Sequence, residues 1–417
     1  MLLKRVGGPV RAAGFICALI IAVISQCGIS SGADSSVKAS VTVREEFDDN
    51  VLLTNTDKKS DFITRAAPTF SLAYKTQDWD FSMDNTFSFW HYARGGNSSY
   101  SDNLALTSKL TVLKNLVYFD VTDTYANVVV EPKAPSSDAN LNVNRTDSNV
   151  LNASPYIQYE IDARSMVRAG YVYTNIWYRQ NGVNRQQHKG FLNAEHKLTP
   201  LLDVVLGAEY MTDRPEGAQP SDNQKAISAT IKYDLDPRTK VDGTAGYRWL
   251  SFSNSLARNA PTYNAGISYS FAELSKAEFR AQSDFAPTAL NGFAETARQE
   301  IRVIYGVSAI STLNGSIYHR EVDYTEINRK DKAYGLSAGF DFSPMERTKV
   351  HLSGSYEKDD FLPEHQSKNV YFVSAGADYN LTPKAVLGLT YRYQKSVGNA
   401  ANNFSDNLAG VQIKMEL

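Results

Sequence analysis

One five-residue pattern returns along the chain in the same setting, and it constrains the fold more than any other feature. An aromatic residue is followed by any residue, an apolar residue, a small polar residue and proline, as in segments 233–237 (YDLDP), 340–344 (FDFSP) and 379–383 (YNLTP). Segment 196–200 (HKLTP) has a histidine in the aromatic place, and segments 269–273 and 305–309 keep the spacing without the proline. The last positions fall at 200, 237, 273, 309, 344 and 383, a period of 35 to 39 residues. A fixed period indicates repeated supersecondary units.

The segments between these turns alternate between apolar and polar residues. In 227–235, Ile227, Ile231 and Tyr233 point one way, while Ser228 and Lys232 point the other. Segments 350–357, 386–394 and 411–417 alternate in the same way. Successive side chains of a strand face opposite sides, so each segment predicts a strand with one apolar and one polar face. Each repeat therefore consists of a strand, a polar loop, a second strand and a tight turn preceded by a ring.

This unit is typical of a closed β-barrel in an outer membrane, which has aromatic girdles and short periplasmic turns. Further short turns near 75–77, 113–115 and 162–164 bring the total to nine, which predicts ten hairpins and about 20 strands, with 18 as the alternative. The predicted fold is all-β, a transmembrane up-and-down antiparallel barrel whose interior is too wide for side chains to fill. The alternative, a soluble sandwich, usually shows irregular Greek-key spacing.

The first 33 residues predict a signal peptide, and residues 34–417 predict a single barrel domain. Lys4, Arg5 and Arg11 precede an apolar run at 12–24, and small residues at 31–33 offer a cleavage site. Lipidation of Cys27 is a further possibility in this segment. No run of 18 apolar residues occurs elsewhere, which excludes a helical membrane protein. These features predict the outer membrane as the location, with its lipid and the barrel assembly machinery as partners.

Composition excludes several kinds of chemistry. Both cysteines, Cys17 and Cys27, lie in the predicted signal peptide, so the remaining chain has no disulfide, catalytic thiol or cysteine metal site. Without residues 1–33, 40 basic residues stand against 45 acidic ones, a net charge of −5 that does not favour nucleic acid. The six histidines have no metal-ligand spacing, and no G-x-S-x-G motif occurs. We predict no enzyme activity, no cofactor and no metal, although a serine and a histidine on adjacent strands remain open as a catalytic pair.

Polar stretches separate the strands at the rim opposite the tight turns, at 93–103, 131–149, 179–189, 213–225, 283–295, 358–369 and 396–406. The longest, 131–149, is the third. A solvated surface loop is the commoner arrangement, but a long third loop folds inward in trimeric diffusion porins. If this one narrows the pore, its charged residues set the charge preference: Glu131, Lys133, Asp138, Arg145 and Asp147. Four charged residues are expected on the lumen wall, and we interpret them as lining residues that pair with opposite charges and not as a binding site: Lys232, Arg248, Glu357 and Arg392.

The N-terminal part of the barrel resembles a known family. Segment 45–54 (EEFDDNVLLT) is followed by 59–74 (KSDFITRAAPTFSLAY). This is similar to the start of the β-barrel porin type 2 proteins and of the related outer-membrane barrels associated with exopolysaccharide and exosortase loci. The resemblance covers about 40 residues, together with the proline turns, and it implies no catalytic residues. The last residue, Leu417, departs from the phenylalanine with which such barrels commonly end.

Three functions follow as hypotheses. The leading one, which the resemblance supplies, is a passive conduit for a secreted exopolysaccharide that works with periplasmic polysaccharide-export proteins. The second is a general diffusion porin for small solutes, which predicts an inward third loop. The third is a structural sleeve around a partner such as a multihaem cytochrome, which predicts an occupied lumen.

Overall fold

The computed structural model describes residues 34–94, 98–141, 143–217, 221–253, 257–288, 293–324, 329–399 and 402–417. The predicted signal peptide, 1–33, and with it the lipidation of Cys27, lie outside these residues. The described part contains twenty strands in one sheet and no α-helix. None of the described residues forms a helix long and apolar enough to cross a membrane.

The strands follow one another along the chain with short connections at one rim and longer ones at the other. Their bounds are β1 Asp34–Asp48, β2 Asp61–Lys75, β3 Trp79–Tyr92, β4 Ser99–Leu113, β5 Val117–Val129, β6 Arg145–Asp162, β7 Ser165–Tyr178, β8 Arg185–Thr199, β9 Leu202–Pro215, β10 Asp222–Asp236, β11 Thr239–Phe252, β12 Ala257–Ala272, β13 Ser275–Pro287, β14 Phe293–Ser308, β15 Ser311–Tyr324, β16 Arg329–Met345, β17 Thr348–Leu362, β18 Gln366–Thr382, β19 Ala385–Val397 and β20 Phe404–Glu416.

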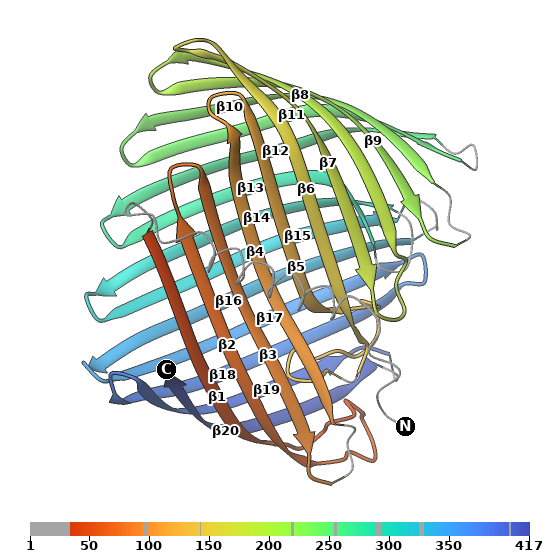
Figure 1. The fold of residues 1–417 in the computed structure, drawn as a ribbon. Helices are drawn as coiled ribbons and strands as arrows, with labels where there is room; N and C mark the ends of the chain where they lie inside the picture. The colour runs from red at the N-terminus through yellow and green to blue at the C-terminus, as the bar shows by residue number, and fades with distance from the viewer. Residues whose placement is uncertain are drawn as a thin grey trace, which may run out of the picture.

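The sheet closes on itself because the first strand pairs with the last. β1 is antiparallel to β2 on one side and to β20 on the other, with Ser40 opposite Glu416 and Asp48 opposite Leu408. Figure 1 shows this closure, with β1 in red beside β20 in dark blue. A closed barrel leaves no unpaired sheet edge, which is what hydrocarbon requires of any spanning sheet. The predicted 20-stranded antiparallel barrel is confirmed.

Local chemistry explains the repeated pattern at the short turns. Asp236 Oδ1 accepts hydrogen bonds from the backbone N–H groups of Arg238 at 2.7 Å and Thr239 at 2.9 Å. The hydroxyl of Thr382 likewise accepts from Lys384 N at 3.2 Å. The small polar residue thus satisfies the backbone of the turn, and the proline that follows needs no N–H partner there. The nine turns lie at 76–78, 114–116, 163–164, 200–201, 237–238, 273–274, 309–310, 346–347 and 383–384.

The apolar faces of the strands point out of the barrel. The rings of the repeat are exposed: Tyr233 by 36%, Tyr269 by 46%, Tyr305 by 47% and Tyr379 by 44%. A second group of exposed rings lies near the opposite rim: Phe62, Phe89, Tyr210, Trp249, Tyr334 and Tyr371. Two rings of aromatic residues with aliphatic side chains between them form the outer surface that a barrel presents to lipid.

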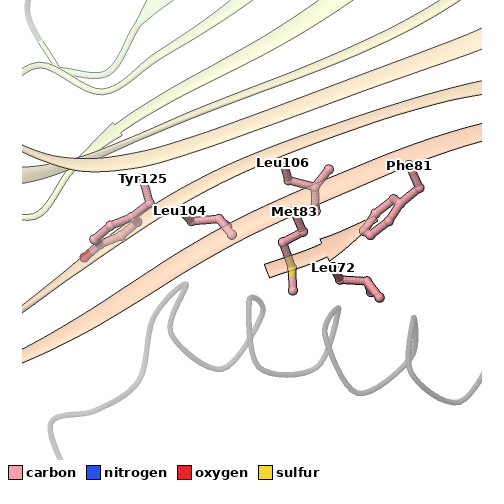
Figure 2. Packing of buried hydrophobic residues seen from close by; sticks show 6 residues of the cluster. All are labelled: Leu72, Phe81, Met83, Leu104, Leu106 and Tyr125. Carbon is pink, nitrogen blue, oxygen red and sulfur yellow. The ribbon is translucent and has the colours of Figure 1, made fainter. Parts of the chain in front are cut away.

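Neighbouring strands also pack their outward side chains against one another. Figure 2 shows six buried apolar residues of β2 to β5, Leu72, Phe81, Met83, Leu104, Leu106 and Tyr125. Leu72 lies on the same alternating face of β2 as the exposed Phe62, and cross-strand pairing places Met83 beside both Leu72 and Leu106. The cluster is therefore a patch of the barrel's outer surface and not a core inside it.

The strands run further toward the long-loop rim than the sequence predicted. The stretch 358–369 was expected to be a loop, but β17 continues to Leu362 and β18 begins at Gln366. Similarly, 179–189 shortens to a loop at 179–184, and β8 starts at Arg185. The expected loop boundaries were wrong because polar residues occupy both faces there, so the hairpins stay paired after the alternation has ended.

Candidate pore and inward third loop

The segment between β5 and β6, residues 130–144, is called the third loop below. Pro132 and Pro135 lack a backbone N–H and so cannot continue a ladder. At the base of the loop, Asn144 has a φ of 54°, a left-handed conformation that asparagine tolerates. Its side chain accepts a hydrogen bond from Glu131 N at 3.0 Å and donates one to Glu131 O at 2.7 Å. These bonds hold the two ends of the third loop together at its base.

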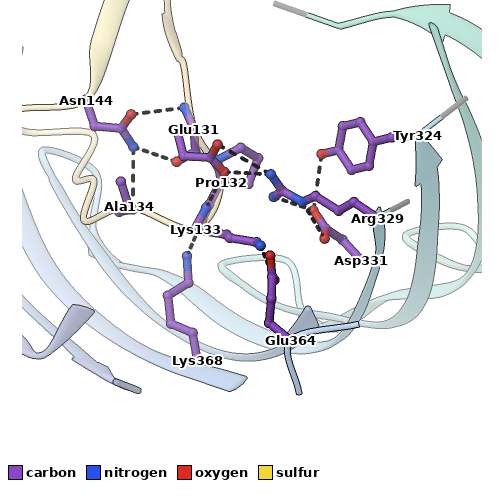
Figure 3. A network of polar contacts seen from close by, with 10 residues as sticks. All are labelled: Glu131, Pro132, Lys133, Ala134, Asn144, Tyr324, Arg329, Asp331, Glu364 and Lys368. Atoms are coloured by element: carbon purple, nitrogen blue, oxygen red, sulfur yellow. Dashed lines mark hydrogen bonds and ion pairs between the residues drawn. The ribbon is translucent and has the colours of Figure 1, made fainter. Parts of the chain in front are cut away.

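A buried arginine of a distant strand holds the start of the third loop. Arg329, the first residue of β16, forms an ion pair with Glu131 at 3.0 Å and another with Asp331 at 2.7 Å, as Figure 3 shows. Its side chain is only 10% exposed. The hydroxyl of Tyr324 donates to Asp331 Oδ2 at 3.1 Å, and the Arg329 guanidinium lies 4.8 Å from the Tyr324 ring. Glu131 thus joins a network already built on β15 and β16.

Two lysines extend this attachment to β17 and β18. Lys133 forms an ion pair with Glu364 in the short connection between these strands, and its ammonium lies 5.6 Å from the ring of Phe361. Lys368 donates from Nζ to the backbone oxygen of Pro132 at 2.6 Å (Figure 3). The ion pair with Lys133 lowers the pKa of Glu364 below its ordinary value. Charge of both signs therefore holds this half of the loop.

The second half of the third loop is attached to β19 and to the connection between β1 and β2. Gln394 donates from Nε2 to Ser136 O at 3.0 Å. Asn140 donates from Nδ2 to Val51 O at 2.6 Å. Leu141 packs against an apolar cluster made of Val51, Ile63, Trp90 and Tyr92.

These contacts place the third loop inside the barrel. Its partners on β16 to β19 are up to 258 residues away in sequence, and they lie on inward-facing positions such as Arg392, which donates to Ser137 Oγ at 3.5 Å. Ser137, Ala139 and Asn140 are 3%, 7% and 2% exposed. The third loop therefore crosses from β5 and β6 to the wall formed by β16 to β19 and to the segment that follows β1. It is not the solvated surface loop that was the commoner expectation.

The five charged residues proposed for a constriction have different surroundings. Glu131 and Lys133 attach the loop to the wall, as described above. Asp138 has a side chain that is 89% exposed and pairs with Arg145 at 2.9 Å. Arg145 and Asp147 are in β6 and not in the loop, on the same alternating face as the exposed Ile157, and Asp147 pairs with Arg179 at 3.2 Å. Among the five, Asp138 has the most open side chain, and a role for these charges in selectivity stays a prediction.

The wall opposite these anchors carries a polar recess. Inward side chains from β5 to β13 line a recess of about 570 Å³. Its charged residues pair across strands: Arg248 lies 3.1 Å from Glu209 and 3.3 Å from Asp284, and Lys189 lies 3.7 Å from Glu209. For Arg248 the interpretation of lumen charges as paired lining agrees with these contacts. The recess offers hydrogen bonds and both signs of charge to a solute.

Several residues that hold the loop were not singled out from the sequence. Arg329, Lys368 and Gln394 resemble the many other polar residues of the strands. Asn140 and Asn144 are in a loop rich in polar residues, where an anchoring side chain has no distinctive spacing. The local signal that the segment would leave the sheet was its turn-forming composition, which includes the two prolines.

No protein-family model matches this chain. A search of curated proteins finds no match either. The resemblance of the N-terminal segment to a particular barrel family therefore stays a prediction.

Solved outer-membrane barrels share the fold. The open form of the ferric-catecholate import receptor Fiu from E. coli K12 has a TM-score of 0.50 and 10% identity over 92% of this chain and 82% of that chain. A mutant of the ferric enterobactin receptor PfeA from Pseudomonas aeruginosa has a TM-score of 0.50 and 9% identity over 92% of this chain and 81% of that chain. This chain has the fold of an outer-membrane β-barrel.

Proposed function

We propose that this chain is a passive channel of the outer membrane through which small hydrated solutes diffuse past the third loop. One observation supports the proposal: the third loop is fixed to the inner wall of β16 to β19, while the opposite wall keeps a polar recess. A loop held to one side narrows a lumen without filling it. This arrangement corresponds to the diffusion-porin hypothesis.

The proposed mechanism needs no energy source. A solute in the passage exchanges part of its hydration shell for the hydroxyl, amide and charged groups of the lumen wall. Paired charges such as Arg248 with Glu209 and Asp284 keep the wall polar without a large field of one sign. We expect weak selectivity by charge and a stronger one by size.

Export of an exopolysaccharide remains the second candidate, and the sequence of segments 45–54 and 59–74 favours it. A polymer needs a continuous passage along the lumen, so this function requires a partner that displaces the third loop. Deleting the gene and measuring surface polysaccharide tests this candidate, which an unchanged amount of polysaccharide would contradict.

Conductance of the purified protein tests the main proposal. Reconstituted alone in a planar lipid bilayer, the chain is expected to give discrete steps of ion current. Liposomes that carry it are expected to swell in monosaccharides faster than in larger oligosaccharides. A protein that inserts as a folded barrel and yet carries no current, with or without its third loop, would overturn the proposal. In that case the sleeve hypothesis would take its place.

A further inference from the structure

Three carboxylates meet where the barrel closes. Asp48 ends β1, Asp49 follows it, and Asp406 comes from β20, the strand that pairs with β1. One oxygen of each lies within 4.8 Å of the others. The first and last strands of the barrel thus contribute to one acidic group at the long-loop rim.

Burial makes this group unusual. Asp48 is 1% exposed and Asp406 is 2% exposed. Asp406 Oδ1 is buried and has no hydrogen-bond partner. Carboxylates this close to one another, away from water, repel strongly unless a cation or a proton lies among them.

The cationic side chains nearby do not balance the carboxylates. Arg392 attracts both Asp48 and Asp406, but the same guanidinium also interacts with Glu46 and Asp138. Lys58 reaches the same part of the rim, but its Nζ donates to the backbone oxygen of Ser405 at 2.9 Å and to its hydroxyl at 2.7 Å. Arg392 attracts the Asp406 carboxylate, but no side chain or backbone group of the described residues donates a hydrogen bond to Asp406 Oδ1.

Neutral donors hold the carboxylates in place. Asn407 donates to Asp49 from its backbone N at 2.8 Å and from Nδ2 at 2.7 Å. Asn50 N donates to Asp48 Oδ1 at 2.7 Å. Each carboxylate oxygen has two lone pairs, so these bonds orient the groups and leave lone pairs for a further ligand.

We propose that Asp48, Asp49 and Asp406 form a calcium site that joins the two ends of the barrel. A site made of carboxylate oxygens suits a hard divalent cation, and Ca²⁺ accepts the irregular geometry and additional waters that three carboxylates require. The site lies next to Val51, whose backbone oxygen accepts from Asn140 of the third loop. Ca²⁺ therefore stabilises both the closure and the segment to which the loop is attached.

Terbium luminescence tests this proposal on the full-length purified protein. Tb³⁺ replaces Ca²⁺ in oxygen sites, and the hydroxyl of Tyr391 lies 2.9 Å from Asn407 Oδ1, close enough for this ring to transfer excitation. We expect saturable Tb³⁺ emission on tyrosine excitation and its loss when Ca²⁺ is added. We also expect Ca²⁺ to raise the thermal unfolding temperature relative to EDTA.

Two Asp→Asn variants, one inside the proposed site and one outside it, provide the comparison. Asp406→Asn is expected to lower Tb³⁺ affinity by about tenfold or more, because it removes one of three charged ligands. Asp57→Asn is the matched control: it removes a charge from the exposed part of the loop at 49–60, where the φ of 54° is one that asparagine tolerates. This control is expected to bind like the wild type. If Asp406→Asn does not fold, Asp49→Asn replaces it.

Three results would overturn the calcium site. The first is wild-type protein that gives no saturable Tb³⁺ emission. The second is an Asp406→Asn variant that folds and binds Tb³⁺ as the wild type does. The third is an unfolding temperature that is unaffected by Ca²⁺ but rises on mild acidification, since a proton shared between Asp48 and Asp406 would then account for the buried pair.

Discussion

The wall formed by β16 to β19 and the wall formed by β5 to β13 follow the same alternation of side chains, but their inward side chains have different partners. In both, apolar side chains such as Leu352 and Ile227 point outward and polar ones such as Ser353 and Ser228 point inward. On the first wall, Lys368 and Gln394 bind the third loop. On the second, Arg248 binds carboxylates of its own wall. Alternation along the strand determines which face a side chain is on. Its partner depends on which distant segment of the chain packs against that face.

Removing the third loop should have the largest effect, because it abolishes the difference between the two walls. Replacing residues 131–143 with two glycines leaves both walls lined only by their strands, and we expect single-channel conductance to rise about two- to fourfold, because the narrowest part of the passage is gone. Planar-bilayer recordings measure it. The control replaces residues 180–183, in a loop that does not contribute to the anchors of the third loop, with two glycines. This change should leave conductance unchanged. Equal conductance for the wild type and the third-loop deletion would contradict the assignment of the loop as a constriction.

Weakening the anchor on the first wall should destabilise the protein. Arg329→Gln leaves Asp331 and Glu131 without their guanidinium in a site where the arginine is 10% exposed, and we expect a loss of about 3 kcal/mol. Urea unfolding in detergent or lipid measures this loss, and current recordings should also become noisier. Arg302→Gln, which removes an ion pair whose arginine is 55% exposed, should cost less than about 1 kcal/mol. Similar losses for the two variants would show that the loop contacts add little.

A charge change on the second wall should alter selectivity and leave the third loop in place. Arg248→Gln leaves Glu209 and Asp284 without a shared cation, so the permeability ratio of K⁺ to Cl⁻ should rise about twofold. Reversal potentials in a salt gradient measure the ratio. Arg248→Lys keeps the charge and should change the ratio much less. If Arg248→Gln instead increases the current noise as Arg329→Gln does, the two walls are coupled, and the distinction between them is wrong.

The smallest expected effect is a pH dependence of the loop attachment. Since Lys133 lowers the pKa of Glu364 below the ordinary 4.5 in the folded protein, this ion pair contributes its full stabilisation above that value. The contribution is lost as the pH falls through the lowered pKa. Loop-dependent current noise should therefore be constant from pH 7 to about pH 5 and increase below about pH 4. Glu364→Gln should have the higher noise at every pH, and noise in the wild type that changes between pH 5 and pH 7 would exclude this pair as the cause.

Features of the fold that have a local physical cause could be predicted from the sequence. The turn at 237–238 follows from Asp236, whose carboxylate binds two backbone N–H groups, and Pro237, which needs no donor of its own. The outward direction of Tyr233 follows from the alternation of β10 and from the lipid around a barrel. The loop boundaries near 358–369 were predicted poorly because side chains on both faces contact water above the membrane. The sequence then has no pattern that distinguishes a strand from a loop.

In the candidate site, too, local features could be predicted from the sequence and long-range contacts could not. The length of the third loop and its place as the third of the long loops made it a place to look for a constriction, and Glu131 and Lys133 were identified as charged residues there. Their partners Arg329 and Glu364 are 198 and 231 residues away. No local pattern connects residues at such separations. Arg145 and Asp147, assigned to the same loop, belong to a paired strand.

The amino-acid sequence by itself determined the strand repeat, the turns and the division between an apolar outside and a polar inside, because these depend on residues within a few positions of one another. The tertiary structure decided that the barrel closes with Asp48 and Asp406 side by side and that the third loop binds one wall and leaves the other free. Contacts of this kind depend on the closed shape, which brings distant parts of the chain together and exists only after every strand has paired.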